Sequence, residues 1–296
     1  MVVRPKNAAI EMRFLEYLFR GGLDISKAIT GAAQPQITRT NLAPLAIAFP
    51  MAVEEQRRIV GILDEAFEGI AAAKVRAERN FQNARALFES HVQSVFTQRG
   101  DGWVEKNIGE VCILKSGTSV DVALEKAAGD LPYIKVADMT HVGNEFDIVS
   151  SSRFLNEANI GRNAIFPPGT TIFPKRGGAI LTNKKRLTAV PICADLNIMG
   201  VIPGKGILPK YLYFYFLNID MRQLGSGSSI PQINNYDIEP LVISFPETER
   251  RQAEVVCRLE ELSAETQRLE SIYQRKLAAL EELKKSLLHQ AFSGAL

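Results

Sequence analysis

Two long segments of the chain place charged and apolar residues with a helical period and contain no proline. They cover residues 51–101 and 249–296. In the second segment, larger side chains recur at spacings of four and three over about four heptads, which favours a coiled coil over an ordinary surface helix. The positions of this predicted seam are Leu262, Thr266, Leu269, Tyr273, Lys276, Leu280, Leu283 and Leu287.

The corresponding seam of the first segment holds smaller side chains. Its positions are Ala66, Ile70, Ala73, Ala77, Asn80, Ala84, Leu87 and His91. Small residues on one helix that face large residues on the other let two backbones approach closely and still fill the space between them. We therefore expect the two helices to pack on each other within the chain, antiparallel. The alternative is that each helix packs on its own domain or on a second copy of the chain.

Both long segments belong to a duplicated module. Residues 31–96 and 227–292 align without a gap at a constant offset of 196 residues (227 − 31). Each copy starts with a turn-rich head, continues as a short apolar strand at 45–49 or 241–245 that a proline ends, and then enters the helix. Solenoid repeats have periods of roughly 20–50 residues. The spacing instead indicates one module used twice, with a different domain between the copies.

The repeat continues upstream of its first copy, in a looser register. A short strand at 1–3 and an amphipathic helix at 14–20 have counterparts in a strand at 198–202 and an aromatic helix at 211–217. Residues 1–50 therefore resemble the C-terminal piece of a domain. A piece of about 50 residues buries little core alone. We expect it to dock on another surface, or the natural protein to be longer.

The segment between the copies has the pattern of a β-rich domain. Its short apolar runs, such as 103–108, 111–114, 132–136 and 170–173, alternate with glycine, proline and asparagine turn signals. Many short strands at close spacing predict a twisted, mostly β core with few helices. The fold class is then α+β, with a β-rich domain inserted between two long helices that form an antiparallel coiled coil. The expected divisions are 1–50, 51–101, 102–248 and 249–296.

Composition narrows the class of protein only slightly. The 296 residues allow two domains, and 46% hydrophobic with 23% charged residues is ordinary for a soluble protein. A formal net charge of +2 does not indicate nucleic-acid binding, so such a function must depend on local clusters. Scattered Cys112, Cys193 and Cys257 favour reduced, buried thiols in the cytoplasm. We find no transmembrane run and no signal peptide.

The densest basic run lies at 175–186, where five cations and no acid occur within 12 residues. Cations neutralise DNA phosphates, and arginine and asparagine also read base edges. Two glycines let backbone N–H groups approach phosphate oxygens closely. The alternative is a solvated hairpin with exposed charges. The candidate DNA-binding residues here are Lys175, Arg176, Gly177, Gly178, Asn183, Lys184, Lys185 and Arg186.

A second candidate lies in the head of the second repeat, at 225–236. Its amide side chains offer the paired donor and acceptor that match adenine. The alternative is a turn that caps a strand, and the repeat supports that alternative for 231–233. Positions that differ between the copies are freer to carry partner-specific contacts. The candidate residues are Ser228, Ser229, Asn234, Asn235 and Tyr236.

Signatures of catalysis are missing from the sequence. It has no Gly-x-Gly-x-x-Gly, no P-loop and no Gly-x-Ser-x-Gly motif. The three histidines are far apart, and no metal-ligand spacing occurs. The amino-methyltransferase motif is also missing, because the nearest string, at 166–169, lacks both the amide or acid and the following aromatic residue. We therefore expect no catalytic residue and no metal site, and the pattern favours a binding protein.

Several longer strings resemble the DNA-specificity subunit of type I restriction-modification systems. The inserted domain contains GWVEKNIGEVCILKSGTS, LPYIKVADM, FPPGTTIFPKRGGAI and GSSIPQINNYDIEPLVISFPETERRQ, and the first repeat contains LAIAFPMAVEEQRRIVGILDE. The resemblance implies that residues 102–248 are a target recognition domain for one half of a split DNA site. It also implies that the helices, each about 66 Å long at 1.5 Å per residue, act as a spacer and as the docking surface for methyltransferase subunits.

The same resemblance assigns chemistry to partners. S-adenosylmethionine, ATP and Mg²⁺ would be bound by the methyltransferase and restriction–translocase subunits, and this chain would bind no cofactor. Family members usually have two complete recognition domains, whereas residues 1–50 represent only part of the first. The chain would then be a truncated product, an inactive subunit, or one half of a homodimer formed through the long helices. The alternative function is a structural coiled-coil adaptor for protein partners, and the missing motifs disfavour a stand-alone methyltransferase or nuclease.

Overall fold

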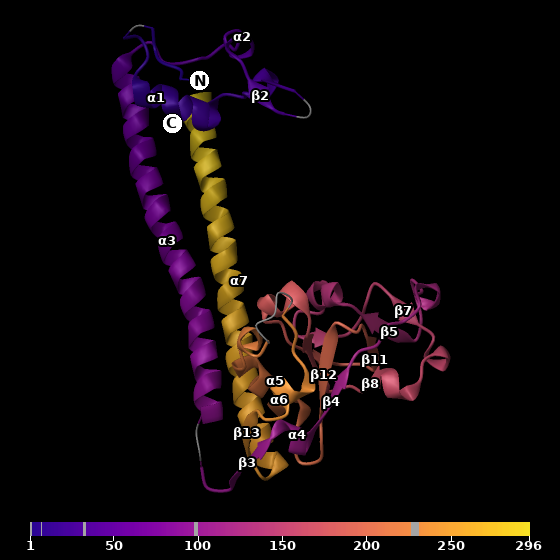
Figure 1. Cartoon of the computed structure of the whole chain (residues 1–296). Helices are drawn as coiled ribbons and strands as arrows, with labels where there is room; N and C mark the ends of the chain where they lie inside the picture. Colours follow the sequence, from indigo (N-terminus) through magenta and orange to yellow (C-terminus); the bar gives the residue numbers. More distant parts are fainter. Residues whose placement is uncertain (1, 7, 32–33, 98–99, 226–230) are drawn as a thin grey trace. The chain divides into compact units, whose positions relative to one another are not determined.

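The computed structural model describes residues 2–6, 8–31, 34–97, 100–225 and 231–296 (Figure 1). The chain divides into two compact units. The first unit contains Met1–Arg85 and Thr266–Leu296, and the second contains Ala86–Glu265. The long helices α3 (Val53–Thr97) and α7 (Glu249–Ser293) contribute residues to both units.

Helices α3 and α7 pack together in antiparallel fashion, as predicted (Figure 1). Lys74 Nζ donates to Glu281 Oε1 at 2.7 Å, and Arg85 pairs with Glu270. As the residue number rises along α3, the residue number of the contacting α7 side chain falls, as in an antiparallel pair. Both cations are about half exposed, so these ion pairs add little stability. Buried side chains such as Leu63 hold the helices instead.

The predicted seams are right over part of each helix and shifted by one position elsewhere. Ala77 and Ala84 are buried, but Leu87 is 64% exposed and its neighbour Phe88 packs against the core. An α-helix has 3.6 residues per turn, so a strict 3.5-residue repeat drifts away from the contact face of nearly straight helices. The predicted seam positions that are exposed are Asn80, Leu87, His91, Lys276 and Leu283.

The first unit has a small apolar cluster formed by α1, the N-terminal part of α3 and the C-terminal part of α7. Phe14 and Tyr17 of α1 pack with Leu63 and Leu288, and the Phe14 ring meets Phe292 edge-on at 5.3 Å between centroids. The helix predicted at 14–20 is therefore confirmed. The elements of the first unit that precede α3 are α1 (Met12–Tyr17), a π-helical turn (Leu18–Gly22), a 3-10 turn (Ser26–Ala28), β1 (Ile29–Thr30) paired with β2 (Gln36–Ile37), and α2 (Arg39–Leu42).

Two strands predicted for this unit are wrong. Residues 2–3 and 45–49 have no strand pairing in the described part of the chain. The repeat explains the second case, because the equivalent strand β13 (Val242–Pro246) pairs antiparallel with β3 (Trp103–Asn107). No described segment of the first unit lies beside 45–49 in that way. Residues 45–49 instead contribute to a groove of about 960 Å³ lined mainly by apolar side chains.

The second unit has the expected β-rich core. Its sheets have the strand orders β4-β12-β9-β10-β6, β7-β5-β11-β8 and β13-β3. The other strands are β4 (Cys112–Ser116), β5 (Leu131–Ile134), β6 (Asp147–Ile148), β7 (Phe154–Leu155), β8 (Ile165–Phe166), β9 (Thr171–Pro174), β10 (Arg186–Thr188), β11 (Ile192–Ala194) and β12 (Ile198–Pro203), with α4 (Ile108–Val111), α5 (Pro209–Asn218) and α6 (Asn235–Ile238) between or after them.

The aromatic helix α5 fastens this core together. Its side chains from 211 to 216 are all buried. Tyr211 Oη donates to the Ser244 carbonyl at 2.9 Å and Tyr215 Oη to the Val242 carbonyl at 3.1 Å, so both hydroxyls find partners on β13. The Phe96 ring of α3 packs edge-on against both tyrosines. The aromatic side chains of α5 therefore connect α3 to β13.

A buried glutamine fastens the start of each long helix in the same way. Gln252 is fully buried, and its Oε1 accepts from the Leu208 backbone N–H at 2.9 Å. Its Nε2 donates to the carbonyls of Gly206 and Pro246 at 2.7 and 2.9 Å. These contacts satisfy backbone groups that are buried or partly shielded from water. The first turn of α7 is thereby tied to the end of β13 and to the start of α5.

Gln56, the equivalent residue of the first repeat, makes the same three contacts. Its Oε1 accepts from the Glu11 N–H at 2.7 Å, and its Nε2 donates to the carbonyls of Ala9 and Pro50 at 2.8 and 2.7 Å. The duplication seen in the sequence thus extends to hydrogen bonding. It also explains why residues 9–11 pack before α1 as residues 206–208 pack before α5.

The cysteines follow the prediction in two of three cases. Cys112 and Cys193 are buried free thiols, whereas Cys257 is exposed on α7. The prediction of burial for Cys257 was wrong because the residue points away from the seam of its helix. None of the helices in the described part of the chain combines the length and apolar character that a membrane span requires.

Candidate nucleic-acid interface

The five-stranded sheet brings much of the basic run to one end of its strands. Strand β9 finishes at Pro174 and β10 starts at Arg186, and the two strands are antiparallel. Lys175 and Arg176 therefore leave the sheet at the same end at which Lys184 enters it. We call this surface, made by residues 175–178 and 183–186, the basic end.

Backbone hydrogen bonds join the second candidate stretch to the basic end. The N–H of Ile233 donates to the Lys175 carbonyl at 2.9 Å, and the N–H of Gly177 donates to the Pro231 carbonyl at 2.8 Å. The two stretches pair antiparallel between these contacts. Two regions about 50 residues apart in the sequence therefore form one continuous surface.

The segment between β9 and β10 is not the solvated hairpin considered as an alternative. It forms a 3-10 helix, η7 (Gly177–Thr182), and two of its flanking cations are buried. Lys175 Nζ donates to Ser116 Oγ at 2.7 Å, and burial lowers the pKa of this lysine. This ammonium group connects the end of β9 to the end of β4 and faces the interior.

Lys185 is held still more firmly. Its side chain is 3% exposed, and its Nζ donates to Asn183 Oδ1 at 2.7 Å and to the Ile219 carbonyl at 2.6 Å. Burial lowers its pKa to about 8. Arg186 Nε donates to the Asn144 carbonyl at 2.6 Å and is half-buried. A role for these cations in DNA contact stays a prediction, while their hydrogen bonds show that they position loops.

The accessible part of the basic end is smaller than the sequence suggests. Arg176 is exposed and Lys184 is partly exposed. A Cβ atom added at Gly177 or Gly178 would meet no heavy atom within 4 Å, so the backbone there faces open space. Asn183 has a left-handed backbone (φ 53°), and its Oδ1 accepts from Lys185, which fixes the turn. Arg176, Lys184 and the two glycines thus remain available to a partner.

Hydrogen bonds between side chains connect Gln232, which lies opposite Arg176, to the aromatic side chain of Tyr236. Gln232 Nε2 donates to Asn234 Oδ1 at 2.6 Å, and Asn234 Nδ2 donates to Tyr236 Oη at 2.8 Å. The Asn234 N–H donates to Asp237, which caps α6. Tyr236 is 65% exposed, and Asn235 is exposed as well. The candidates Ser228 and Ser229 lie outside the described residues.

Residues 100–277 match the family model described as the type I restriction modification DNA specificity domain. This match covers more than half of the chain. The chain belongs to that family. The type I restriction enzyme MjaIX specificity subunit of Methanocaldococcus jannaschii is 24% identical over 160 residues, which are 51% of this chain and 35% of that relative. The match thus spans about a third of the relative's length.

Solved structures show that the specificity-subunit fold extends over nearly the whole chain. A chain from "Structural basis underlying complex assembly and conformational transition of the type I R-M system" superposes with a TM-score of 0.86 at 19% identity, covering 99% of this chain and 74% of that one. The HsdS subunit from Thermoanaerobacter tengcongensis gives 0.61 at 19% identity, covering 99% and 73%. At these identities the likeness concerns the fold.

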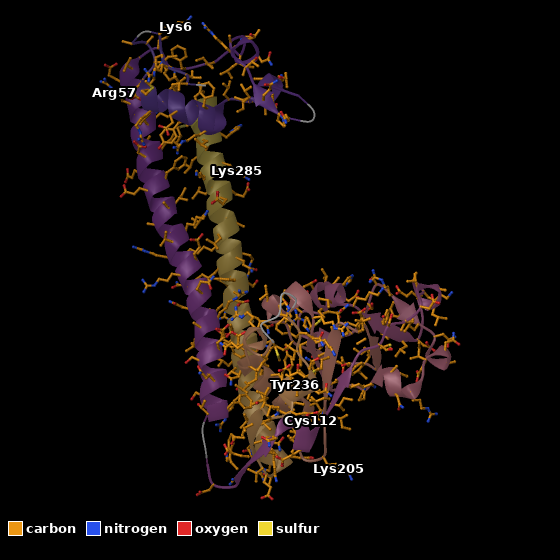
Figure 2. All side chains as sticks on the ribbon, viewed as in Figure 1. Lys6, Arg57, Cys112, Lys205, Tyr236 and Lys285 are labelled. Carbon is orange, nitrogen blue, oxygen red and sulfur yellow. The ribbon has the colours of Figure 1, made fainter. Side chains whose placement is uncertain are left out.

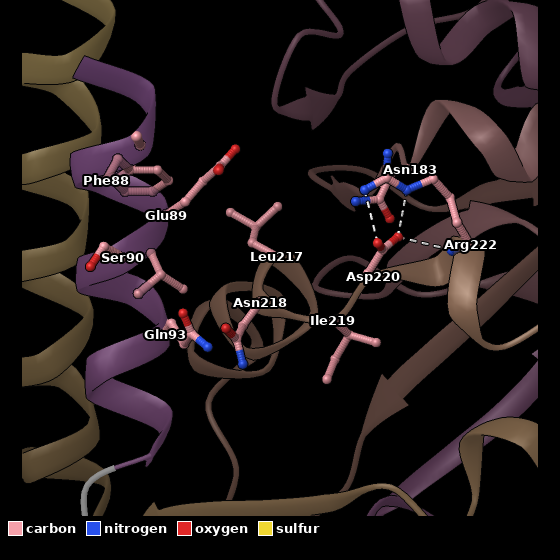
Figure 3. A pocket seen from close by; sticks show the side chains of 12 residues that line it. Phe88, Glu89, Ser90, Gln93, Asn183, Leu217, Asn218, Ile219, Asp220 and Arg222 are labelled. Atoms are coloured by element: carbon pink, nitrogen blue, oxygen red, sulfur yellow. Dashed lines mark hydrogen bonds and ion pairs between the residues drawn. The ribbon is translucent and has the colours of Figure 1, made fainter. Parts of the chain in front are cut away.

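A polar pocket of about 430 Å³ adjoins the basic end of this specificity-domain chain at Asn183 (Figure 3). Asn183 contributes to it, together with six α3 residues between 86 and 93, the last two residues of α5, and residues 219, 220 and 222 that follow α5. Arg222 donates twice to the Asp220 carboxylate, at 2.7 and 2.8 Å, and lowers its pKa. The carboxylate and the guanidinium are thus paired with each other. Within the described residues, no group of three His, Cys, Asp or Glu side chains could hold a metal ion.

The sequence reasoning missed a loop that adjoins the basic end. Residues 141–149 contain β6 at 147–148, the strand beside β10. Val142 is 86% exposed and Phe146 is 47% exposed, whereas Asn144 between them is 1% exposed. The available signal was a glycine–asparagine turn flanked by apolar residues in HVGNEF. That pattern was indistinguishable from an ordinary surface turn until the sheet order was known.

Proposed function

We propose that this chain is a non-catalytic specificity subunit. It binds double-stranded DNA sequence-specifically and directs adenine methyltransferase and restriction subunits to a bipartite site. The observation that carries the proposal is the joined surface at Arg176, Gly177 and residues 231–236, in a chain of the specificity-domain family. S-adenosylmethionine, ATP and Mg²⁺ then belong to the partner subunits, in agreement with the missing nucleotide-binding motifs.

The chemistry of the basic end suits a DNA groove. Arg176 and Lys184 neutralise phosphates and fix the register of the duplex. The open backbone at 177–178 lets the chain approach the sugar–phosphate strands closely. Asn235 and Tyr236 extend beyond it, where an amide can pair with adenine and a phenol can donate to or accept from a base edge. The roles divide between positioning by cations and reading by neutral polar groups.

The two long helices supply the docking part of the proposal. An antiparallel pair of 45-residue helices exposes long charged faces to which methyltransferase subunits bind. Only one β-rich reader occurs among the described residues, so a bipartite site requires a second reader. A second copy of the chain, joined through the long helices, supplies it. This arrangement predicts a site with two related halves.

The test uses the chain assembled with its methyltransferase subunit. Arg176→Gln combined with Lys184→Gln should weaken binding to all duplexes and lower the slope of log affinity against log salt by roughly 0.9 for each lost phosphate contact. Lys205→Gln is the matched control, because Lys205 is exposed beyond the opposite end of β12 (Figure 2). Unchanged affinity and slope in the double variant, with intact assembly, would favour a protein adaptor instead.

A further inference from the structure

We propose that the loop at residues 141–149 is a second reading element, in which Phe146 and Val142 make apolar contacts with base edges in the groove that the basic end occupies. The inference rests on the proposed DNA-binding function and deepens it. It assigns sequence discrimination to residues that carry no charge and no hydrogen-bonding side chain. Thymine, with its C5-methyl group, is the base such side chains distinguish best.

Sheet topology places this loop at the basic end. Strand β6 pairs parallel with β10, with Asp147 opposite Leu187. The residues just before β6 therefore lie beside those just before β10. Two hydrogen bonds confirm the neighbourhood: the Leu187 N–H donates to the Phe146 carbonyl at 3.2 Å, and Arg186 Nε donates to the Asn144 carbonyl at 2.6 Å. The half-buried arginine of the basic run is thus the link between the two surfaces.

Apolar side chains are exposed around this end of the sheet. Val142 is 86% exposed, Phe146 is 47% exposed, and Leu181 of η7 is 63% exposed. Exposed apolar residues that gather at one place, beside cations, mark an interaction surface more often than residues scattered singly. Continuity with Arg176 and Lys184 makes DNA the occupant, because the same partner that covers the cations then covers the apolar loop.

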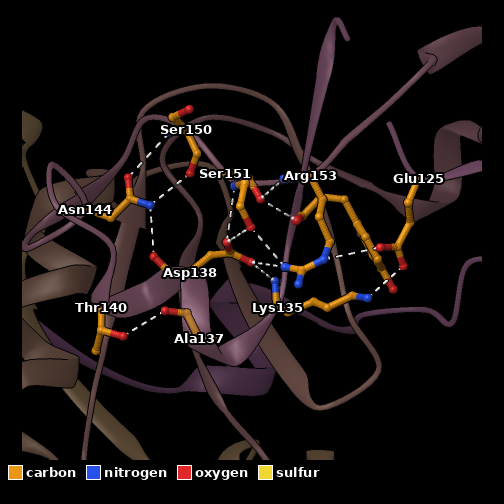
Figure 4. Close-up of polar contacts among 11 residues, drawn as sticks. Glu125, Lys135, Ala137, Asp138, Thr140, Asn144, Ser150, Ser151 and Arg153 are labelled. Carbon is orange, nitrogen blue, oxygen red and sulfur yellow. Dashed lines mark hydrogen bonds and ion pairs between the residues drawn. The ribbon is translucent and has the colours of Figure 1, made fainter. Parts of the chain in front are cut away.

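The loop is held rigid by one buried asparagine (Figure 4). Asn144 Nδ2 donates to the carbonyls of Asp138 and Ser150 at 2.9 and 2.8 Å. Its Oδ1 accepts from the Val149 N–H at 3.0 Å. One side chain therefore closes the base of the loop from both sides. A reading element fixed before binding loses little conformational entropy when DNA arrives.

A second layer of polar contacts supports the base of the loop. Asp138 is 3% exposed and accepts from the Lys135 N–H at 2.8 Å and from Ser152 Oγ at 3.0 Å. Glu125 then holds Lys135 Nζ at 2.6 Å and Arg153 Nε at 3.3 Å (Figure 4). These residues precede and follow the loop in the sequence, and their charged side chains form ion pairs with one another. The conformation of 141–149 is therefore determined by the protein before any partner binds.

Of the two acids in residues 141–149, Glu145 lies before β6 and is held by the loop itself. Glu145 accepts from the Gly143 N–H through both carboxylate oxygens, at 3.1 and 2.9 Å, and this hydrogen bonding lowers its pKa. A permanent carboxylate repels phosphates. The loop tip therefore avoids the DNA backbone and faces the base edges, which separates its role from that of Arg176 and Lys184.

The experiment compares Phe146→Ala and Val142→Ala with the control Ile113→Ala in the chain assembled with its methyltransferase subunit. Ile113 is 63% exposed on β4 of the same sheet, near the end of that strand opposite the basic end. Methylation is measured over a library of duplexes, together with affinity as a function of salt. We expect the loop variants to relax discrimination at one or two adjacent base pairs by roughly 5- to 150-fold, with an unchanged salt slope.

Two outcomes overturn the inference. An unchanged sequence preference in both loop variants excludes reading by this loop, and loss of subunit assembly shows that it docks protein. Phe146→Leu, which keeps apolar bulk, guards against a folding defect and should alter the preference less than Phe146→Ala. If the unmodified complex itself shows no sequence preference, the proposed function fails first and this inference falls with it.

Discussion

Removing the amide of Gln252 tests the device that ties the second unit to its long helix. Gln252→Ala deletes three hydrogen bonds and leaves without their side-chain partner the buried carbonyl of Pro246 and the part-buried N–H of Leu208 and carbonyl of Gly206. An unsatisfied buried polar group costs about 1–3 kcal/mol. Water entering the cavity would satisfy some of these groups. We therefore expect the free energy of unfolding of the second unit to fall by about 2–5 kcal/mol.

Hydrogen exchange followed by mass spectrometry measures this effect locally. Gln252→Ala should accelerate exchange in α5 and β13, while Gln56→Ala should accelerate exchange around α1 in the first unit. The control is Gln274→Ala, an exposed position on α7, which should change stability by no more than about 0.5 kcal/mol. Unchanged exchange in α5 and β13 after Gln252→Ala would refute the reasoning, as would equal acceleration in both units from either variant.

Three further outcomes are expected. Leu63→Ala, at a fully buried position of α3, should lower the free energy of unfolding by about 2–5 kcal/mol, whereas Leu87→Ala, at an exposed position, should change it by less than about 0.5 kcal/mol in urea unfolding. Burial holds the pKa of Lys185 near 8, below its ordinary 10.5, so between these values the unfolded chain binds more protons and the contribution of Lys185 to stability rises with pH. The free energy of unfolding of Lys185→Met relative to the native chain should therefore fall by up to about 3 kcal/mol between pH 7 and 10.5; a pH-independent difference would contradict the assignment. Iodoacetamide should alkylate Cys257 in the folded protein and the two buried thiols only after unfolding, as peptide mass spectrometry would show.

Local sequence patterns predicted the long helices and most of the strands of the second unit. Proline-free periodic segments predicted α3 and α7, and their antiparallel packing followed from the small side chains facing large ones. Which residues of each helix face the seam could not be predicted throughout. A shift of one position replaces Leu87 by Phe88 at the contact, and the choice between them depends on the side chains that pack against the helix. The strand at 45–49 failed for a related reason: strand formation needs a pairing partner, and sequence pattern alone does not supply one.

The candidate site shows the same division between local and long-range information. The cations at 175–186 were visible as residue types, but their burial was not, since Lys185 is enclosed by groups as distant as Ile219. The pairing of 175–177 with 231–233 depends on backbone hydrogen bonds between separate segments. The loop at 141–149 became a candidate only when β6 was found beside β10. The residue types therefore indicated which positions could bind DNA, and the topology determined which of these side chains are exposed.

The central claim is that this chain chooses the DNA sequence at which its partners act. The most direct measurement is co-expression with the methyltransferase subunit, followed by mapping of methylated adenines across a genome, with and without this chain. We expect methylation at a single bipartite motif that depends on the chain and weakens when Arg176 and Lys184 are both replaced by glutamine. Methylation without a common motif, or the same motif in the absence of the chain, would contradict the account.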